Sequence, residues 1–407
     1  MLKTIQILAI LLLTTFLGYG QTENYWVKKS DLGSDTTGNG LKRERAVAFT
    51  IDDFAYVGTG VDTAEHVLKD FWKYDPIANA WTQVADLPGS VRRNAVAFAI
   101  QGYGYVGTGV DSLTATTPGS QKMTDFWRYD ATLNSWSQIS NMPGAGRYFA
   151  TGFAIDSKGY VCCGKFGPNN YSNQLYEYKP TTDTWTQLPS FPGGVRYQLS
   201  SFVIDYKAYV GLGTDQDMYR DDFWEFDATT NLWSPISPLP ASERASAMTF
   251  SIGQRGFVCM GTNGGYLDDL WEYNPFTDDW TSRAKYGGTR RKNGVGFTLN
   301  GLGYVGSGKG YSGKKASFQE YHPVGVLGMD ELDVAINIYP NPTQDQINIK
   351  SSSLLKEIIV KDNYGKEVLR TTNYQNINVH HLMPGIYFVS AVADNGTVQS
   401  NQKFIKL

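Results

Sequence analysis

The feature that most constrains the fold is an aromatic pattern that recurs six times at fixed spacing. In every copy an Arg is followed by a Phe after six residues and by a second aromatic residue after 13. The copies begin 47 to 55 residues apart, a period typical of chains built from repeated supersecondary units. The six arginines are Arg43, Arg92, Arg147, Arg196, Arg244 and Arg291, and the aromatic residues at the longer offset are Tyr56, Tyr105, Tyr160, Tyr209, Phe257 and Tyr304.

A second aromatic pair completes each unit and predicts four short strands in it. In five copies an aromatic residue and a Trp stand seven positions apart, and the Trp precedes the next Arg by 11. In the first copy we expect strands at 46–50, 55–58, 70–75 and 81–84, with a turn at 75–79. A four-stranded sheet cannot bury both faces alone, so the pattern predicts six sheets packed radially as a β-propeller. The pairs expected to pack between blades are Tyr74/Trp81, Tyr129/Trp136, Tyr178/Trp185, Phe226/Trp233 and Tyr273/Trp280.

The last repeat lacks its Trp, and we expect the missing strand at the start of the chain. Gly328 stands where the sixth Trp would be, whereas Asn24-Tyr25-Trp26-Val27 precedes the first repeat. We therefore predict that this N-terminal strand completes the last blade and closes the ring. The predicted fold class is all-β, with a six-bladed propeller over residues 21–324.

These residues resemble kelch repeats over roughly 24–324. That six-bladed family includes the catalytic propeller of galactose oxidase and bacterial N-acetylneuraminate epimerases. The usual Gly-Gly after strand two appears here as Gly-Thr-Gly, Gly-Leu-Gly or Gly-Ser-Gly, with Cys163-Gly164 and Met260-Gly261 in two units. This departure weakens the assignment to any one kelch subfamily, but it leaves the predicted fold unchanged.

The first 20 residues are predicted to be a secretory signal peptide. Lys3 supplies a positive start, Ile7 to Leu17 an apolar stretch, and Gly18 and Gly20 the small residues that a signal peptidase needs. The alternative is a retained membrane anchor, for which the apolar run is short. We expect no membrane span after signal removal.

The aromatic repeat stops before the last 75 residues, which instead contain short runs of alternating apolar and polar residues. These runs predict a small Ig-like β-sandwich over 333–407, after a linker at 325–332. They also resemble the C-terminal sorting domain of the type IX (Por) secretion system of Bacteroidetes. The resemblance rests on Tyr339-Pro340-Asn341-Pro342, on Leu382 to Tyr387 with its Gly385, and on the terminus Lys403-Phe404-Ile405-Lys406-Leu407. It implies the type IX secretion machinery as a partner, and release or attachment at the outer cell surface. The alternative is an accessory sandwich without a sorting role.

Charge and residue counts exclude several classes of function. The chain has 36 Lys and Arg against 39 Asp and Glu, and this net charge of −3 excludes a general nucleic-acid footprint. The resemblance to galactose oxidase raises a copper centre, which needs two nearby histidines and a cysteine–tyrosine crosslink. The histidines are too few and too scattered for it, and we expect no metal and no cofactor; they are His66, His322, His380 and His381.

Other candidate chemical groups have a simpler interpretation. Cys162 and Cys163 are adjacent on a strand, so we expect their side chains on opposite faces. We interpret them, with Cys259, as buried free thiols. Asp215-Gln216-Asp217 lacks the glycine and distal Glu of a calcium loop. Adjacent carboxylates (Asp52-Asp53, Asp221-Asp222, Asp268-Asp269) diverge along a strand and do not support a paired acid/base role.

The six arginines are the one constellation with functional potential. All precede strand one, so we expect them on one rim of the propeller together with the loops between strands two and three. One interpretation is structural, in which each Arg pairs with carboxylates or loop carbonyls. The other is that some face an acidic ligand, because the guanidinium fork matches a carboxylate. Tyr148 and Tyr197, each just after its Arg, would then stack on a sugar ring.

These observations favour a secreted or cell-surface binding protein without catalysis, which recognises a glycan or a protein at the Arg-bearing rim. The alternative is a sugar mutarotase resembling the N-acetylneuraminate epimerases, whose reaction needs only an acid and a base over the bound sugar. A third hypothesis is a structural component of the cell surface. A closed pocket would favour a small ligand, and a broad flat surface a protein.

Overall fold

The computed structural model describes residues 24–33, 40–113, 119–216, 218–323, 337–350, 355–362, 366–393 and 398–407. The predicted signal peptide and the predicted linker lie outside these ranges. The chain divides into two compact units, one up to Pro323 and one from Val324 onward, and each is described by itself. Every secondary-structure element assigned within the described ranges is a β-strand.

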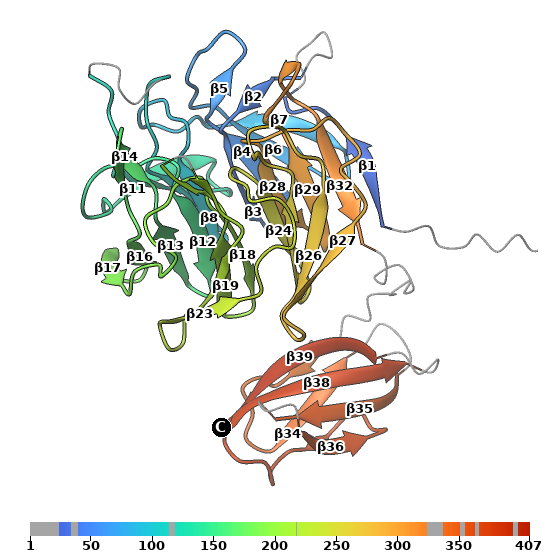
Figure 1. Cartoon of the computed structure of the whole chain (residues 1–407). Helices are drawn as coiled ribbons and strands as arrows, with labels where there is room; N and C mark the ends of the chain where they lie inside the picture. The colour runs from blue at the N-terminus through green and yellow to red at the C-terminus, as the bar shows by residue number, and fades with distance from the viewer. Residues whose placement is uncertain are drawn as a thin grey trace, which may run out of the picture. The chain divides into compact units, whose positions relative to one another are not determined.

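The first unit consists of six four-stranded antiparallel sheets (Figure 1). The first strand of each sheet contacts that of the next, and β28 contacts β3, so the six inner strands form a closed ring. This confirms the six-bladed β-propeller. The blades are β3 (Val47–Ile51), β4 (Phe54–Gly58), β6 (Phe71–Asp75) and β7 (Ala80–Val84); β8 (Val96–Ile100), β9 (Tyr103–Gly107), β10 (Phe126–Asp130) and β11 (Ser135–Ile139); β12 (Thr151–Ile155), β13 (Lys158–Cys162), β16 (Leu175–Lys179) and β17 (Thr184–Leu188); β18 (Ser200–Ile204), β19 (Lys207–Gly211), β22 (Phe223–Asp227) and β23 (Leu232–Ile236); β24 (Met248–Ile252), β25 (Arg255–Cys259), β26 (Leu270–Asn274) and β27 (Asp279–Arg283); and β28 (Val295–Leu299), β29 (Leu302–Gly306), β32 (Phe318–His322) and β1 (Tyr25–Lys29).

The fixed aromatic spacing has a direct structural cause. Phe49 on β3 and Tyr56 on β4 are cross-strand partners, and their rings stack with centroids 5.2 Å apart. The same Phe also packs against the next blade, because a Cβ on Gly104 would lie 2.2 Å from its ring. The offset therefore encodes a hairpin register and a contact between blades at once.

The Trp residues of the outer strands join neighbouring blades. The indole Nε1 of Trp81, for example, donates to the Ser30 carbonyl at 3.1 Å, and that of Trp136 to Ala85 at 2.9 Å. Trp26 on β1 makes the equivalent bond to Ala284 at 3.1 Å, and it pairs in register with Tyr321 on β32. The N-terminal strand thus supplies the sixth Trp, and the predicted closure is confirmed.

The second unit packs two sheets into a small sandwich. One sheet contains β33 (Asn337–Tyr339), β34 (Gln346–Lys350) and β37 (Ile377–Asn378), and the other contains β36 (Glu367–Thr371), β35 (Leu355–Lys361), β38 (Gly385–Ala393) and β39 (Val398–Lys406). The buried core between them includes Ile347, Ile358, Val360, Val389 and Phe404. The predicted β-sandwich is therefore present.

Four small two-stranded sheets, with strands of two or three residues each, lie at one face of the propeller in its described part. They are β2 (Arg43–Glu44) with β5 (Val61–Asp62), β14 (Lys165–Gly167) with β15 (Asn170–Tyr171), β20 (Thr214–Asp215) with β21 (Met218–Tyr219), and β30 (Lys309–Gly310) with β31 (Gly313–Lys314). Bridges such as Tyr148↔Lys165 and Lys292↔Lys309 join the segment before strand one to the loop after strand two. We call the face formed by these segments and loops (43–46 and 59–70 in the first blade, and their equivalents) the loop face.

Candidate ligand-binding face

The six predicted arginines all lie at the loop face, but they are buried. Their exposed fractions are 3% or less. In each repeat one Nη1 donates to the carbonyl 16 residues later, at 2.9 to 3.3 Å. The acceptors are Thr59, Thr108, Cys163, Leu212, Met260 and Ser307.

Four of the arginines also pair with a carboxylate of their own blade. Arg92 donates to both oxygens of Asp125 at 2.9 and 2.7 Å, and Arg43, Arg196 and Arg244 grip Asp70, Asp222 and Asp269 in the same way. A buried fork that already holds a carboxylate has no donor pair left for another, and contact of these guanidinium groups with a ligand stays a prediction. The structural interpretation of the arginines fits this placement.

A Trp two residues further on strengthens each of these pairs. Trp127 Nε1 donates to Asp125 at 2.7 Å. Burial alone would raise the pKa of the Asp125 carboxyl, but the hydrogen bonds from Arg92 and Trp127 outweigh it and lower that pKa below its usual value. The same balance lowers the pKa of Asp70 and of Asp269.

Blades three and six have no such carboxylate. Arg147 donates instead to Ser172 Oγ and Gln174 Oε1, at 3.2 and 3.0 Å, and its guanidinium lies 5.2 Å from the Tyr176 ring. Arg291 donates to the carbonyl and hydroxyl of Ser317 at 3.2 and 3.1 Å. Burial lowers the pKa of both arginines.

The Asp partners were missed from the sequence, although a signal is present. In the four paired blades the partner opens the motif Asp-Phe-Trp or Asp-Leu-Trp at the start of strand three. In blade three the motif is Gln174-Leu175-Tyr176, and in blade six Ser317-Phe318-Gln319. Acid and Trp are thus replaced together, as expected when the two share one hydrogen-bonded cluster with the Arg.

The departure from Gly-Gly after strand two also has a local explanation. Thr59 takes φ of 62° and Gly60 takes φ of 93°, and the other five units have the same pair of left-handed residues. The Thr59 carbonyl accepts from Arg43, while Gly60 N donates to the Arg92 carbonyl of the next blade at 2.9 Å. Only the second position requires Gly, because a Cβ there would lie 2.6 Å from the Glu44 carbonyl oxygen.

The residues that lie two positions after each Arg form a closed ring at the loop face. Each backbone N–H donates to the carbonyl of its counterpart in the preceding blade, at 2.8 to 3.3 Å, and the last bond runs from Arg45 to Asn293. All six adopt left-handed φ of 54° to 61°, although none is Gly. Such strain in non-glycine residues is typical of functional positions. The ring residues are Arg45, Asn94, Phe149, Gln198, Ser246 and Asn293.

The predicted Tyr197 lies in an aromatic cluster beside this ring, whereas the predicted Tyr148 is almost fully buried at 5% exposure. The Tyr197 ring stacks on that of Tyr171, with centroids 5.2 Å apart and planes within 10°. The Lys165 ammonium lies 4.8 Å from the Tyr197 centroid and 5.1 Å from that of Tyr171. Burial lowers the pKa of Lys165. Tyr171 and Lys165 were not predicted, because only the fold brings them beside Tyr197.

A second aromatic and lysine cluster lies on the loops of the last two blades. Tyr266 and Tyr311 meet edge to face at 4.7 Å, and Lys292 Nζ lies 5.5 Å from the Tyr266 ring. Tyr311 is 76% exposed. The loop face therefore presents aromatic rings and basic groups together at two places.

Inside the ring of blades there are two small hollows. One, of about 230 Å³, is lined partly by small residues that directly precede the inner strands, such as Ala46, Ala95, Ala150 and Gly294. The other, of about 370 Å³, is lined by inner-strand residues further along, including Phe49, Phe98 and Phe153. The first is too narrow and too plainly lined to select a ligand by itself.

The cysteines differ from expectation in one respect. Cys162 and Cys163 were expected to point to opposite faces of the strand, but their Sγ atoms lie 3.4 Å apart. The cause is the left-handed φ of 64° at Cys163, which ends the alternation just after β13. Burial raises the pKa of the Cys163 and Cys259 thiols. Within the described ranges no three His, Cys, Asp or Glu side chains gather as metal ligands would.

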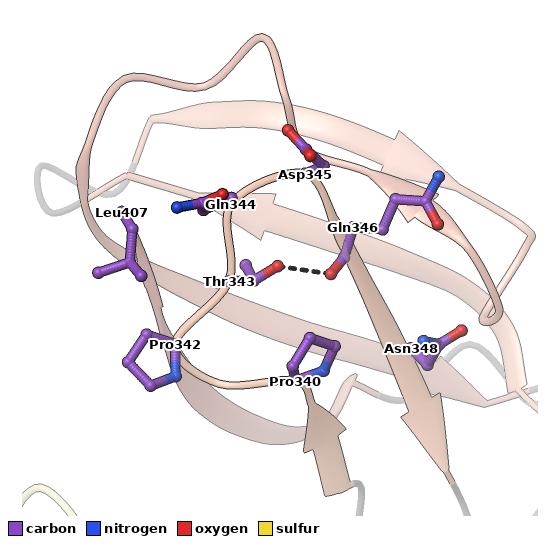
Figure 2. Close-up of a pocket in the computed structure, with 8 residues that line it drawn as sticks. All are labelled: Pro340, Pro342, Thr343, Gln344, Asp345, Gln346, Asn348 and Leu407. Carbon is purple, nitrogen blue, oxygen red and sulfur yellow. Dashed lines mark hydrogen bonds between the residues drawn. The ribbon is translucent and has the colours of Figure 1, made fainter.

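In the second unit the predicted sorting residues from both ends of the domain meet. Thr343 N donates to the Ile405 carbonyl at 2.9 Å, Leu407 N to the Thr343 carbonyl at 2.8 Å, and Ile405 N to Asn341 Oδ1 at 2.9 Å. Figure 2 shows residues that line the resulting open pocket, with Pro340 and Pro342 on one side and Leu407 near Pro342. The volume of this pocket is about 540 Å³. Thr343 Oγ1 donates to the Gln346 carbonyl at 2.6 Å across its floor.

The remaining sorting residues belong to the same sheet. Gly385 on β38 pairs with Lys406 on β39, and the buried Phe404 stacks on Tyr387 at 5.5 Å. The side chain of the predicted Lys403 lies outside the described part. The structure therefore joins the Pro-Asn-Pro segment, Gly385 and the chain end into one surface.

Comparisons with known proteins bear on both units. The KLHDC2/KLHL20/DRC7 Kelch-repeats domain matches residues 140–297, and the secretion system C-terminal sorting domain matches residues 337–406. A solved structure titled "Structure of YjhT" is similar with a TM-score of 0.61 and 18% identity, covering 70% of this chain and 96% of that chain. This identity shows the fold alone. A search of the curated proteins gave no match.

The propeller is thus of the kelch-repeat class. Part of the propeller, residues 140–297, matches a Kelch-repeats domain, and the second unit matches a secretion system C-terminal sorting domain. That sorting domain indicates export by type IX secretion, to the cell surface or into the medium. No helix in the described ranges is long and apolar enough to cross a membrane.

Proposed function

We propose that this protein is an exported, non-catalytic binding protein whose propeller recognises a glycan at the loop face. The observation that carries the proposal is the stacked pair of Tyr171 and Tyr197 with Lys165 over both rings. Both tyrosines are half-buried and come from adjacent blades. Tyrosine offers a rigid apolar face and a polar tip, which together suit the apolar face and the hydroxyls of a sugar.

The charge at this cluster adds to the argument. No carboxylate lies within ion-pair distance of Lys165 among the described residues, and its pKa is lowered by burial. An anionic substituent on the sugar would relieve that desolvation by supplying a partner. The cluster thus fits an acidic glycan better than a neutral one.

A sugar mutarotase is the second candidate, and the same lysine favours it. A lysine with a lowered pKa is closer to exchanging a proton near neutral pH than an ordinary one. Tyr197 lies beside it as a hydroxyl-bearing partner. The two candidates share one face and differ only in whether the bound sugar exchanges its anomers.

The test is a screen of the purified full chain against an array of acidic and neutral glycans, repeated with Tyr197→Ala and Lys165→Gln. We expect binding by the wild-type chain and a loss of at least about tenfold, 1.4 kcal/mol, in each variant. The matched control is Tyr206→Ala, since Tyr206 is 48% exposed but lies in the turn between β18 and β19, away from the loop face. Glycan binding that survives Tyr197→Ala would contradict the proposed site. Anomer exchange of a bound sugar, followed by NMR, would favour the mutarotase.

A further inference from the structure

At the mouth of the propeller, where the ring of six residues closes, the cationic side chains outnumber the carboxylates that contact them. Five cations lie there: Arg45 acts through space on Arg93 and Lys292, Lys309 acts on Lys292, and Lys314 acts on Glu65 together with Arg45 and Lys309. Two carboxylates, those of Glu44 and Glu65, form ion pairs with these cations. Glu44 lies 3.6 Å from Arg45 and accepts from Asn293 Nδ2 at 2.8 Å, and Glu65 pairs with Lys314 at 2.5 Å. The mouth thus has an excess of positive charge, although the net charge of the whole chain is −3.

Two donors in the same place are buried and have no acceptor among the described residues. Arg93 is 3% exposed; its Nε donates to the Ser112 carbonyl at 2.6 Å and its Nη2 to Leu113, but Nη1 has no partner among the described residues. Asn94 is 7% exposed and its Nδ2 is likewise unpaired in the described part, whereas Arg45 Nε lies 3.6 Å from Glu44 Oε2. A buried donor without an acceptor has lost its hydrogen bonds to water without replacement, which destabilises the folded chain.

These donors belong to one corner of the mouth. Asn94 N donates to the Arg45 carbonyl at 3.2 Å, so the two residues are neighbours in the ring. The Arg45 guanidinium lies 5.5 Å from the ring of Phe149, which is the next ring residue after Asn94. The Arg45 side chain therefore extends past its neighbour Asn94 to Phe149. Burial, and after it the nearby Arg45 charge, lowers the pKa of Arg93 to about 10.

We propose that this corner is a binding site for one compact anion, the carboxylate or sulfate group of an acidic glycan, held by Arg45, Arg93 and Asn94. Such a group supplies the acceptor oxygens that the unpaired donors lack and the negative charge that the surplus cations lack. The inference rests on the proposed function and specifies the charged end of its ligand.

The corner is continuous with the tyrosine cluster. Phe149, under Arg45, lies 5.9 Å from the Tyr197 ring, which in turn stacks on Tyr171. A sugar ring on the tyrosines would thus place its acidic substituent toward Arg45, with Phe149 between the two contacts. One ligand can engage both.

The first test is Asn94→Asp, which replaces the unpaired amide by a carboxylate of nearly the same shape. Both residues tolerate the left-handed φ of 54° at this position. The new carboxylate takes the place of the ligand anion, so we expect the thermal midpoint of the full chain to rise by about 2 °C or more. The matched control is Asn300→Asp, which has φ of 51° in an exposed turn away from the loop face and should leave the midpoint unchanged. A fall in the midpoint for Asn94→Asp would overturn the inference.

The second test measures binding of the full chain to three disaccharides that share one skeleton: neutral, uronic-acid and sulfated. We expect at least one acidic probe to bind about tenfold more tightly than the neutral one or better, and Asn94→Asp and Arg45→Asn to remove that preference. The acidic arms show which anion is accepted. Arg255→Gln, on a side chain that pairs with Glu272 far from the ring, should retain the preference.

The outcomes separate the two proposals. Equal binding of the neutral and acidic probes, still lost in Tyr197→Ala, overturns the anion site and leaves glycan recognition standing. Binding of neither acidic probe overturns the anion site whatever Asn94→Asp does to stability. An unchanged acidic preference in Arg45→Asn and Asn94→Asp overturns it as well.

Discussion

Blades one, two, four and five differ from blades three and six in one buried cluster. In the first group an Arg, an Asp and a Trp share hydrogen bonds, as in Arg92, Asp125 and Trp127. In the second group the Arg is equally buried but meets only neutral acceptors, as Arg147 meets Ser172 and Gln174. The carbonyl bond 16 residues along the chain is common to all six.

The difference shows which part of the arginine's role is indispensable to the blade. Its contact with the left-handed turn after strand two holds that turn against the next blade in every repeat, whereas the ion pair is an addition that two blades omit. Four predictions sharpen this comparison.

The largest effect is expected from removing the Arg itself. Arg92→Met leaves the Asp125 carboxylate with a buried charge and no cation, and should lower the free energy of unfolding by about 3–5 kcal/mol. Arg147→Met leaves only neutral acceptors without their donor, and should lower the free energy of unfolding by about 1–3 kcal/mol. Denaturant unfolding followed by Trp fluorescence measures this, since all ten Trp residues precede residue 281 and report on the propeller alone. Equal losses in the two variants would break the comparison.

Removing only the acid should make a paired blade resemble blade three. Asp125→Asn keeps an acceptor for Arg92 but removes the negative charge, and we expect a loss of about 1–3 kcal/mol in the free energy of unfolding. The matched substitution is Gln174→Ala in blade three, which deletes the neutral acceptor of Arg147. A larger loss for Gln174→Ala than for Asp125→Asn would mean that the charge contributes nothing.

The paired blades should also make the propeller sensitive to acid. The pKa values of Asp70, Asp125 and Asp269 are lowered in the folded chain. Their stabilisation is therefore complete above the unfolded pKa of about 3.9 and is lost as pH falls through the lower folded pKa. Urea unfolding at pH 6 and at pH 3 should show a smaller drop for Asp125→Asn than for the wild-type chain. Parallel drops would contradict the cited pKa direction.

The smallest effect is expected from converting blade three toward the paired type. Gln174→Glu places a carboxylate beside Arg147, and should raise the free energy of unfolding at neutral pH by about 1 kcal/mol or less, because the glutamate is partly exposed and Tyr176 replaces the Trp. The gain should vanish at pH 3. A loss at neutral pH would show that blade three excludes the charge for reasons of packing.

The sequence was sufficient for the fold because its spacings are set by cross-strand neighbours. The Arg-to-aromatic offset follows from the pairing of Phe49 with Tyr56, and ring closure follows from the count of Trp residues, which Trp26 completes. The sandwich of the second unit followed from alternation and turn residues in the same way.

The site was less predictable, because its contacts span loops of unequal length. Arg92 and Asp125 are separated by 33 residues, whereas Arg244 and Asp269 are separated by 25, so no fixed offset connects each Arg to its acid. The ring at the mouth depends on left-handed backbone at Arg45, Phe149 and Gln198, which are residue types that rarely adopt it. The six predicted arginines lie at the loop face as expected but are buried there, and their contact with a ligand stays a prediction.

The most direct test of the account is the affinity of the full chain for one acidic glycan, measured with Tyr197→Ala and with Tyr206→Ala on samples whose unfolding midpoints are also recorded. We predict a loss of at least about tenfold for Tyr197→Ala, with binding retained in Tyr206→Ala and both midpoints close to the wild-type value. Undiminished binding by folded Tyr197→Ala would contradict it, since the loop-face tyrosines would then not be the site.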